Sequence, residues 1–433
     1  MKGGPGRGRM LRAHEYKPGF NNTMTSPTGA EAPQVIDSPT AWLRLAVAVA
    51  ISTIGGVGMW SFMVALPAIQ SDFGASRAEA SLPFTFVMLG FAGGGVLMGR
   101  LADRFGIAVP LGIGTVMLTT GYIAAAWSPS LWLVALAHGL IGIGCSASFG
   151  PMMTDISHWF LRRRGIAVAL AAVGNYTAGA IWPPVVQHFI STSGWRATHV
   201  GIGLFCLVTI LPLVYAMRAR IKGQHAETDS AAARRQAEAP FSPLTLQILL
   251  CIAGVGCCVA MAMPQVHIVA YCGDLGYGVA RGAEMLSIML GFGIISRIAS
   301  GFVADRIGGV RTLLLGSVLQ GVALFLYLWF DGLISLYVIS ALFGLFQGGI
   351  VPSYAIIVRE YFSPREAGTR LGLVLMATLI GMALGGWMSG LIFDLTGSYR
   401  AAFLNGLGWN LMNVSIMTWL LQRSRRRPAL ATA

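Results

Sequence analysis

The sequence predicts an all-α membrane protein whose twelve transmembrane helices form two pseudo-symmetric six-helix bundles. Hydrophobic residues make up 55% of the 433 residues and charged residues only 11%, with a mean hydropathy of +0.68. A soluble domain of this length does not need so apolar a composition. Twelve runs reach the roughly 20 apolar residues that a spanning helix requires. The second half of the chain also repeats features of the first.

The twelve runs predict helices rather than a closed barrel, because they lack the alternation of polar and apolar residues that barrel strands show. The runs are centred near Ile54, Leu89, Thr115, Gly142, Val173, Cys206, Ile252, Leu290, Gln320, Phe343, Leu379 and Leu411.

The repeat is clearest in two charged blocks that interrupt the apolar runs. Residues 99–106 read GRLADRFG, and residues 301–308 read GFVADRIG, 202 positions later. Gly142 and Phe160 are repeated at the same offset as Gly344 and Phe362. This spacing predicts two homologous bundles, residues 42–217 and 244–422. Residues 218–243, rich in Arg, Ala, Glu, Gln and Ser, are the expected cytoplasmic linker.

Within the first bundle, glycines and short polar segments define the elements in order. The first helix, Trp42–Ile69, contains Gly55-Gly56-Val57-Gly58, which allows close packing or local unwinding. The second, Leu82–Gly99, carries small residues four apart, a pattern that lets another helix approach closely. Between the fifth and sixth helices, the segment Ser193–Arg196 is expected to return the chain across the membrane.

The distribution of positive charge predicts the orientation of the protein. With the N-terminus in the cytoplasm, about 25 of the 30 Lys and Arg lie on the cytoplasmic side. Four lie outside (Arg77, Arg196, Arg281 and Arg400), and Arg297 lies within a span. This positive-inside bias places both termini in the cytoplasm, as a disordered tail of residues 1–41 and a basic tail of residues 423–433. The net charge of +13 therefore indicates contact with the lipid bilayer rather than nucleic acid.

Several functional classes find no support in the sequence. The six cysteines lack metal-ligand spacing, and there is no Ser-His-Asp arrangement or phosphate-binding loop, so we expect no enzyme, metal or cofactor. A non-transporting sensor is a weaker alternative, because no sizeable cytoplasmic domain is present. Short loops, no secretory signal and no glycosylation sequon in an outward loop favour a bacterial inner membrane.

The two charged blocks resemble the loops between helices 2 and 3 and between helices 8 and 9 of major facilitator superfamily transporters. The resemblance implies the major facilitator fold and a cytoplasmic ionic latch that holds the halves together when the transporter faces outward. The alternative is a plain topogenic charge cluster. Residues implied in this latch are Gly99, Asp103, Arg104, Asp155, Gly301, Asp305 and Arg306.

Arg297 is the one charged residue expected well inside a span. Ionisable residues there are costly and usually face a cavity with a functional role. A guanidinium stays charged and matches the geometry of a carboxylate, so it favours an organic anion. The alternative is an arginine whose side chain reaches the cytoplasmic interface or a backbone carbonyl.

Residues 157–195, which contain HWFLRRRGIAVALAAVGNYTAGAIWPPVVQHFISTSGW, resemble the helix 4 to helix 5 region of monocarboxylate and oxalate/formate-type transporters. That resemblance implies a substrate-binding arginine in helix 8, where Arg297 falls. Two features depart from those families. Gly293 stands where monocarboxylate transporters usually have an aspartate, and no lysine lies in a span, which favours one carboxylate over a dicarboxylate.

We therefore predict a secondary active or facilitative transporter of a small organic anion, a monocarboxylate, that works by alternating access. A multidrug or neutral-solute exporter is the main alternative. A proton is a candidate coupling ion, and symport, antiport, uniport and transfer of the neutral acid all remain open. His138 and His267 are the candidate proton-coupling residues, each with a structural role as the alternative. The candidate substrate-binding residues are Arg297, Asn175, Tyr176, Trp60, Gln265, His267 and Gln347.

Overall fold

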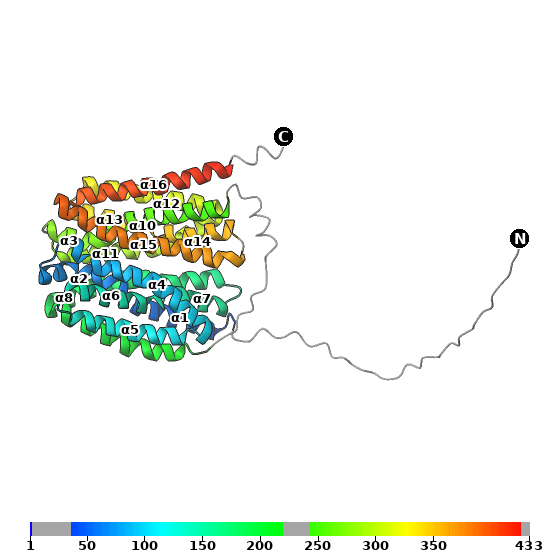
Figure 1. Ribbon diagram of the computed structural model, residues 1–433, viewed down its shortest axis with the longest axis horizontal. Coiled ribbons are helices and arrows are strands. Elements are labelled where there is room, and N and C mark those ends of the chain that lie inside the picture. The colour runs from blue at the N-terminus through cyan, green and yellow to red at the C-terminus, as the bar shows by residue number, and fades with distance from the viewer. Residues whose placement is uncertain (2–35, 220–241, 363, 426–433) are drawn as a thin grey trace.

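The computed structural model describes Met1 and residues 36–219, 242–362 and 364–425, and the described elements are all α-helices. This confirms the predicted all-α membrane fold (Figure 1). Most of the expected N-terminal tail, linker and basic C-terminal tail lies outside the described residues. Helix α16, however, continues to Arg425, into the segment expected to be tail.

The described part of the N-terminal half forms eight helices that make six crossings. Two crossings are interrupted: α1 and α2 meet at Gly56, and α6 and α7 are separated by residues 147–149. The break at Gly56 lies in the glycine-rich segment expected to permit unwinding. The helices are α1 (Pro39–Gly55), α2 (Val57–Phe73), α3 (Arg77–Ala80), α4 (Leu82–Phe105), α5 (Ala108–Ala126), α6 (Leu131–Ser146), α7 (Gly150–Trp159) and α8 (Arg164–Ala216).

Helix α8 accounts for two of these crossings, because it reverses direction at Gly194. This glycine has φ 80° and ψ 160°, within a stretch otherwise continuous in its hydrogen bonding. Both ends of α8 adjoin α1: Arg163 lies over the Trp42 ring, and Arg44 donates to the Met217 carbonyl. The segment expected to turn the chain between the fifth and sixth helices therefore does so.

The C-terminal half repeats this arrangement, with a break in its fourth crossing between α13 and α14. Of the described helices, ten are long and apolar enough to span a membrane; α8 counts once among them, and the less apolar α16 is not included. With α8 as two crossings and α16 as one, the described helices make twelve crossings. The helices are α10 (Pro243–Asp274), α11 (Val279–Ile307), α12 (Gly309–Trp329), α13 (Leu333–Gln347), α14 (Ile350–Tyr361), α15 (Pro364–Thr396) and α16 (Tyr399–Arg425).

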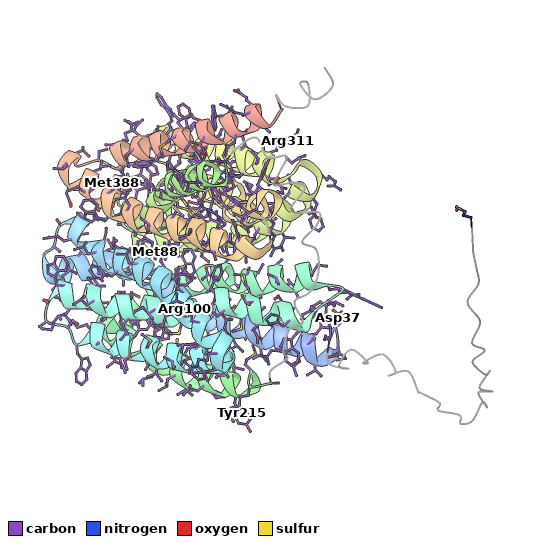
Figure 2. The ribbon with its side chains drawn as sticks, turned by 45° about the vertical axis from the view of Figure 1, so that its right-hand side comes forward. Asp37, Met88, Arg100, Tyr215, Arg311 and Met388 are labelled. Atoms are coloured by element: carbon purple, nitrogen blue, oxygen red, sulfur yellow. The ribbon has the colours of Figure 1, made fainter. Side chains whose placement is uncertain are left out.

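The two halves lie side by side, with both described chain ends at the same end of the bundle (Figure 1). We call this the inner end, because sequence analysis assigns it to the cytoplasm, and the opposite end the outer end. Asp37 and Arg311 both lie at the inner end, on different halves (Figure 2). Helices α4 and α15, α8 and α11, and α2 and α10 contact one another across the interface.

Apolar packing across this interface is strongest towards the outer end and the middle. One hydrophobic cluster joins Trp60 and Tyr176 of the N-terminal half to Met261 and Leu290 of the C-terminal half. Nearer the inner end, the cluster around Leu111 and the cluster around Tyr354 are separate. The halves are therefore closed against each other at the outer end.

Candidate functional site

Arg297 lies at mid-depth in the interface between the halves, on α11. Its guanidinium carbon is 4.2 Å from the centroid of the Tyr176 ring of α8, a cation–π contact between the two halves. Its Nη1 donates a long hydrogen bond of 3.5 Å to the Ala172 carbonyl, while its buried Nε has no partner among the described residues. No described carboxylate forms an ion pair with it. The charge therefore remains available to an anionic ligand.

Gly293 allows the Tyr176 ring to occupy this position. A Cβ atom added to Gly293 would lie 2.5 Å from Tyr176 Cε1 and 2.7 Å from Cδ1. The ring therefore fills the space in which a side chain at position 293 would stand. A side chain four residues before Arg297 would therefore have to displace this aromatic ring of the other half.

Trp60 and Asn175 complete the cluster on the N-terminal side. The indole Nε1 of Trp60 donates to the Asn175 carbonyl at 3.0 Å, and its ring packs edge-on against Tyr176 at 6.4 Å between centroids. Gly179 lets both Trp60 and Leu290 approach the α8 backbone closely. The structure thus brings together four of the predicted substrate-binding residues: Arg297, Tyr176, Trp60 and Asn175.

Gln347 lies next to this cluster, at the end of α13. Its side chain is fully buried, yet neither its Oε1 nor its Nε2 has a partner among the described residues. The following residue, Gly348, packs against the Gly293 carbonyl and Ser296, within one turn of Arg297. A buried amide without partners is costly, so this position suits a polar ligand or a water molecule. Gln265 is also buried, within α10.

The two predicted proton-coupling histidines lie in separate places. His267 is buried between α15 and α16, where its Nε2 hydrogen-bonds the Gly386 carbonyl at 2.8 Å and its Nδ1 contacts the Tyr399 hydroxyl at 3.3 Å. His138 is buried in the N-terminal half, with Nδ1 bonded to the Val134 carbonyl and its ring 5.5 Å from that of His199. None of these contacts of His267 and His138 involves the cluster around Arg297.

The residues predicted to form a cytoplasmic latch lie at the inner end, but the halves do not pack tightly there. Asp103, Arg104, Asp305 and Arg306 are all exposed. An added Cβ at Gly99 or Gly301 would meet nothing within 4 Å, so no helix approaches these glycines closely. In this conformation, the two blocks belong to the open end of the interface.

Asp155, the seventh predicted latch residue, is bound within its own half. Arg44 of α1 donates from Nε and Nη2 to its two carboxylate oxygens at 2.9 and 3.1 Å. The same guanidinium lies 4.3 Å from the centroid of the Trp159 ring and donates to the Met217 carbonyl. This buried pair ties together the inner ends of the first, fourth and sixth crossings.

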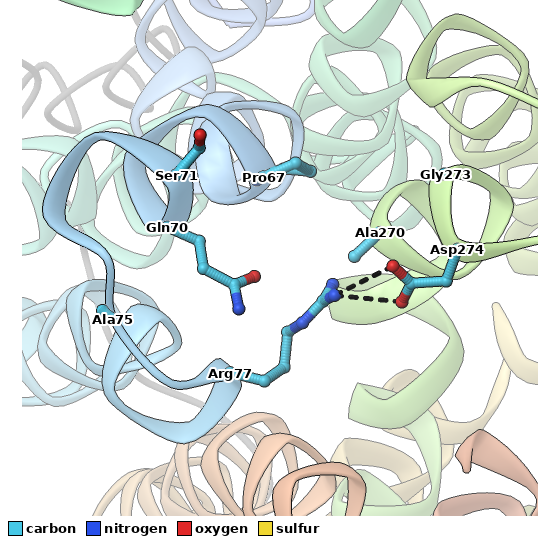
Figure 3. A pocket seen from close by; sticks show the side chains of 8 residues that line it. All are labelled: Pro67, Gln70, Ser71, Ala75, Arg77, Ala270, Gly273 and Asp274. Atoms are coloured by element: carbon cyan, nitrogen blue, oxygen red, sulfur yellow. Dashed lines mark hydrogen bonds and ion pairs between the residues drawn. The ribbon is translucent and has the colours of Figure 1, made fainter. Parts of the chain in front are cut away.

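A latch between the halves, formed by one ion pair, lies at the outer end in this conformation. Arg77 of α3 donates from Nη2 to both carboxylate oxygens of Asp274 on α10, at 2.9 and 3.1 Å (Figure 3). Asp394 of α15 accepts the backbone N–H groups of Arg77 and Ala78 at 2.8 and 2.7 Å. Gly390 of α15 packs directly against the Arg77 carbonyl, so a side chain there would keep the halves apart.

Arg77, Asp274 and Asp394 were not singled out as a site by the sequence, because 197 and 317 positions separate Arg77 from its two partners. One local signal was available. Ser76 and Glu79 form a capping box that fixes the start of α3. Asp274 and Asp394 each follow a long apolar run, which brings them to the same membrane surface as Arg77.

Comparison with known proteins supports the architecture. A family model described as the Major Facilitator Superfamily matches residues 48–335 and 285–433. Monocarboxylate transporter 13 of Bos taurus is 28% identical over 70% of this chain and 71% of its own length. Monocarboxylate transporter 11 of Homo sapiens is 26% identical over 88% of this chain and 83% of its own.

The solved structures that resemble this chain include a bacterial homologue of the human lysosomal transporter Spinster, described as inward-facing and occupied. It superimposes with a TM-score of 0.67 over 89% of this chain and 96% of that one, at 13% sequence identity. The same homologue in an inward-facing, unoccupied form gives a TM-score of 0.66. At these identities, the similarity shows the fold alone.

Proposed function

The chain belongs to the Major Facilitator Superfamily of membrane transporters, and we propose that it carries a small monocarboxylate which binds to Arg297. The observation that supports this most directly is a partly buried guanidinium, in contact with both halves and lacking a carboxylate partner among the described residues. A carboxylate of the substrate supplies the missing charge and accepts hydrogen bonds from the guanidinium. Similarity to monocarboxylate transporters 13 and 11 agrees with this chemistry.

The position of Arg297 also links substrate binding to the movement of the halves. It is carried by α11 but contacts Tyr176 and Ala172 of α8, so its surroundings change when the halves rock. Tyr176 and Trp60 supply an apolar wall for the substrate's hydrocarbon part, and Gln347 supplies a polar group. A ligand that bridges α8 and α11 is the kind that alternating access requires.

The site suits a single carboxylate better than a dicarboxylate or a neutral drug. No second basic side chain contacts the described cluster around Arg297, and a neutral solute would leave the guanidinium uncompensated. For proton coupling, the space near position 293 is filled by Tyr176 rather than by a carboxylate. Uniport of the anion, or exchange of one carboxylate for another, therefore fits this cluster better than a proton carried beside Arg297.

The test is uptake into proteoliposomes of radiolabelled acetate, lactate, pyruvate and benzoate, with and without a proton gradient. We expect Arg297→Gln to reduce uptake at least about tenfold, because a charge-assisted hydrogen bond contributes about 1.5–3 kcal/mol. Arg281→Gln is the matched control, since Arg281 lies on the same helix but pairs with Glu284 at the surface. Absence of uptake by the wild type, or equal uptake by Arg297→Gln, would refute the proposal.

A further inference from the structure

Among the described arginines at the outer end, Arg77 alone is buried. Arg77 is 7% exposed, whereas Arg196, Arg281 and Arg400 are half-buried or exposed at the surface. The Phe393 and Tyr399 rings lie 4.9 and 5.8 Å from its guanidinium carbon and fix its orientation. These rings belong to the C-terminal half, as do the carboxylates that Arg77 binds. The Arg77 guanidinium is therefore held by contacts that must break when the outer end opens.

Some hydrogen-bond donors of the Arg77 guanidinium have no partner among the described residues in this closed state. Only Nη2 binds Asp274, and the buried Nε and Nη1 have no partner among the described residues. Arg77 borders a cavity of about 370 Å³ that is also lined by Gln70 and Ser71 of α2 (Figure 3). This cavity lies between α2 and the end of α10, so it opens further when the halves part. A small carboxylate has room there, and donors that could bind it.

We propose that Arg77 is a second carboxylate-binding site, at which the transported anion docks from outside before it reaches Arg297. When the halves part, Arg77 stays with the N-terminal half, and Asp274 and Asp394 leave with the other. The substrate's carboxylate then takes the place of Asp274 on the guanidinium, as it presents the same two oxygens. Substrate and latch compete for one cation, so binding of substrate favours the outer-open state. This inference rests on the proposed function.

Kinetics of pyruvate uptake separate a binding site from a mere latch. We expect Arg77→Gln to raise the KM about tenfold or more, since a charge-assisted bond to the anion is lost, and Arg77→Lys to restore part of the affinity. Asp274→Asn removes the competitor and should lower the KM about threefold, because more of the protein is competent to bind. If Arg77 were only a latch and did not bind substrate, Arg77→Gln and Asp274→Asn would shift the KM in the same direction. That result would overturn the proposal.

Labelling of a cysteine at the cavity gives a readout that does not need transport. Ala270 of α10 lines the cavity and is only 2% exposed in this closed state, so a cysteine there becomes accessible when the halves part. Ala270→Cys is treated with a membrane-impermeant maleimide, against the background of the six native cysteines, which are buried or half-buried. Pyruvate should increase labelling in the Ala270→Cys protein and leave it unchanged when Arg77→Gln is added. Labelling that pyruvate does not change in the Ala270→Cys protein, or still increases with Arg77→Gln, would overturn the proposal even if one variant folds poorly.

Addition of Arg297→Gln distinguishes this inference from the proposed function. In Ala270→Cys/Arg297→Gln, uptake should be lost while pyruvate still increases labelling, because the outer site is intact. If pyruvate uptake requires Arg297 but the KM and labelling results contradict a role for Arg77, only the outer site is refuted. If the wild type transports no monocarboxylate, both proposals fail together.

Discussion

Arg44 and Arg77 make similar contacts at opposite ends of the molecule, but one stabilises a single half and the other joins the two halves. Each is a buried arginine that binds both oxygens of one aspartate and lies over an aromatic ring. Arg44 binds Asp155 within the N-terminal half, so rocking of the halves leaves the pair intact. Arg77 binds Asp274 across the interface, so the same motion must break it. The position of the partner, not the chemistry of the pair, decides whether an ion pair fixes a bundle or controls a gate.

The largest expected effect comes from breaking the inner pair. Arg44→Gln leaves Asp155 with an uncompensated, mostly buried charge, which should lower the free energy of unfolding by about 3 kcal/mol. Thermal unfolding of the purified protein in detergent measures this loss. The double variant Arg44→Gln/Asp155→Asn should recover much of the stability, because the stranded charge is removed. An Arg44→Gln protein that is as stable as the wild type would show that the pair does not fix the bundle.

An intermediate effect is expected at mid-depth, where α8 and α11 meet between the two ends. Gly293→Ala places a methyl group 2.5 Å from the Tyr176 ring, which must move away from Arg297, at a cost of about 2 kcal/mol. Uptake of pyruvate should fall together with thermal stability. Gly291→Ala on the same helix is the control, because its added Cβ meets only Ala180, at 3.9 Å. Similar losses in both variants would mean that the Tyr176 contact is not what matters.

The smallest expected effect is on the stability of the closed state at the outer end. In Gly390→Ala, the new Cβ would lie 2.8 Å from the Arg77 carbonyl oxygen, and neither this backbone oxygen nor a Cβ fixed to the α15 backbone has much freedom to move. We expect the closed outer state to lose about 1 kcal/mol, roughly a fivefold change in the open-to-closed ratio. Labelling of Ala270→Cys measures that ratio, because Ala270 is buried in the closed state. Gly301→Ala should not increase labelling, since its Cβ meets nothing within 4 Å in this state; equal increases would contradict the comparison of the two ends.

The sequence by itself determined the fold class and the crossings. Hydrophobic runs of spanning length can satisfy their backbone groups in lipid only as helices, and the offset of 202 residues between Asp103 and Asp305 revealed the two halves. Glycine patterns also indicated the break at Gly56 and the turn at Gly194, because these positions need close approach or a positive φ. Arg297 stood out because a charge within a span is costly wherever the chain folds.

Only the tertiary structure decided which residues share a site and which end of the interface is closed. Tyr176 fills the space beside Gly293 because α8 and α11 meet there, and no local pattern encodes a contact between residues of different halves. Arg77, Asp274 and Asp394 likewise meet through the packing of three helices. A transporter whose halves rock closes one end at a time, so its sequence contains the residues that close each end. The packing of a given state decides which of the two ends is closed.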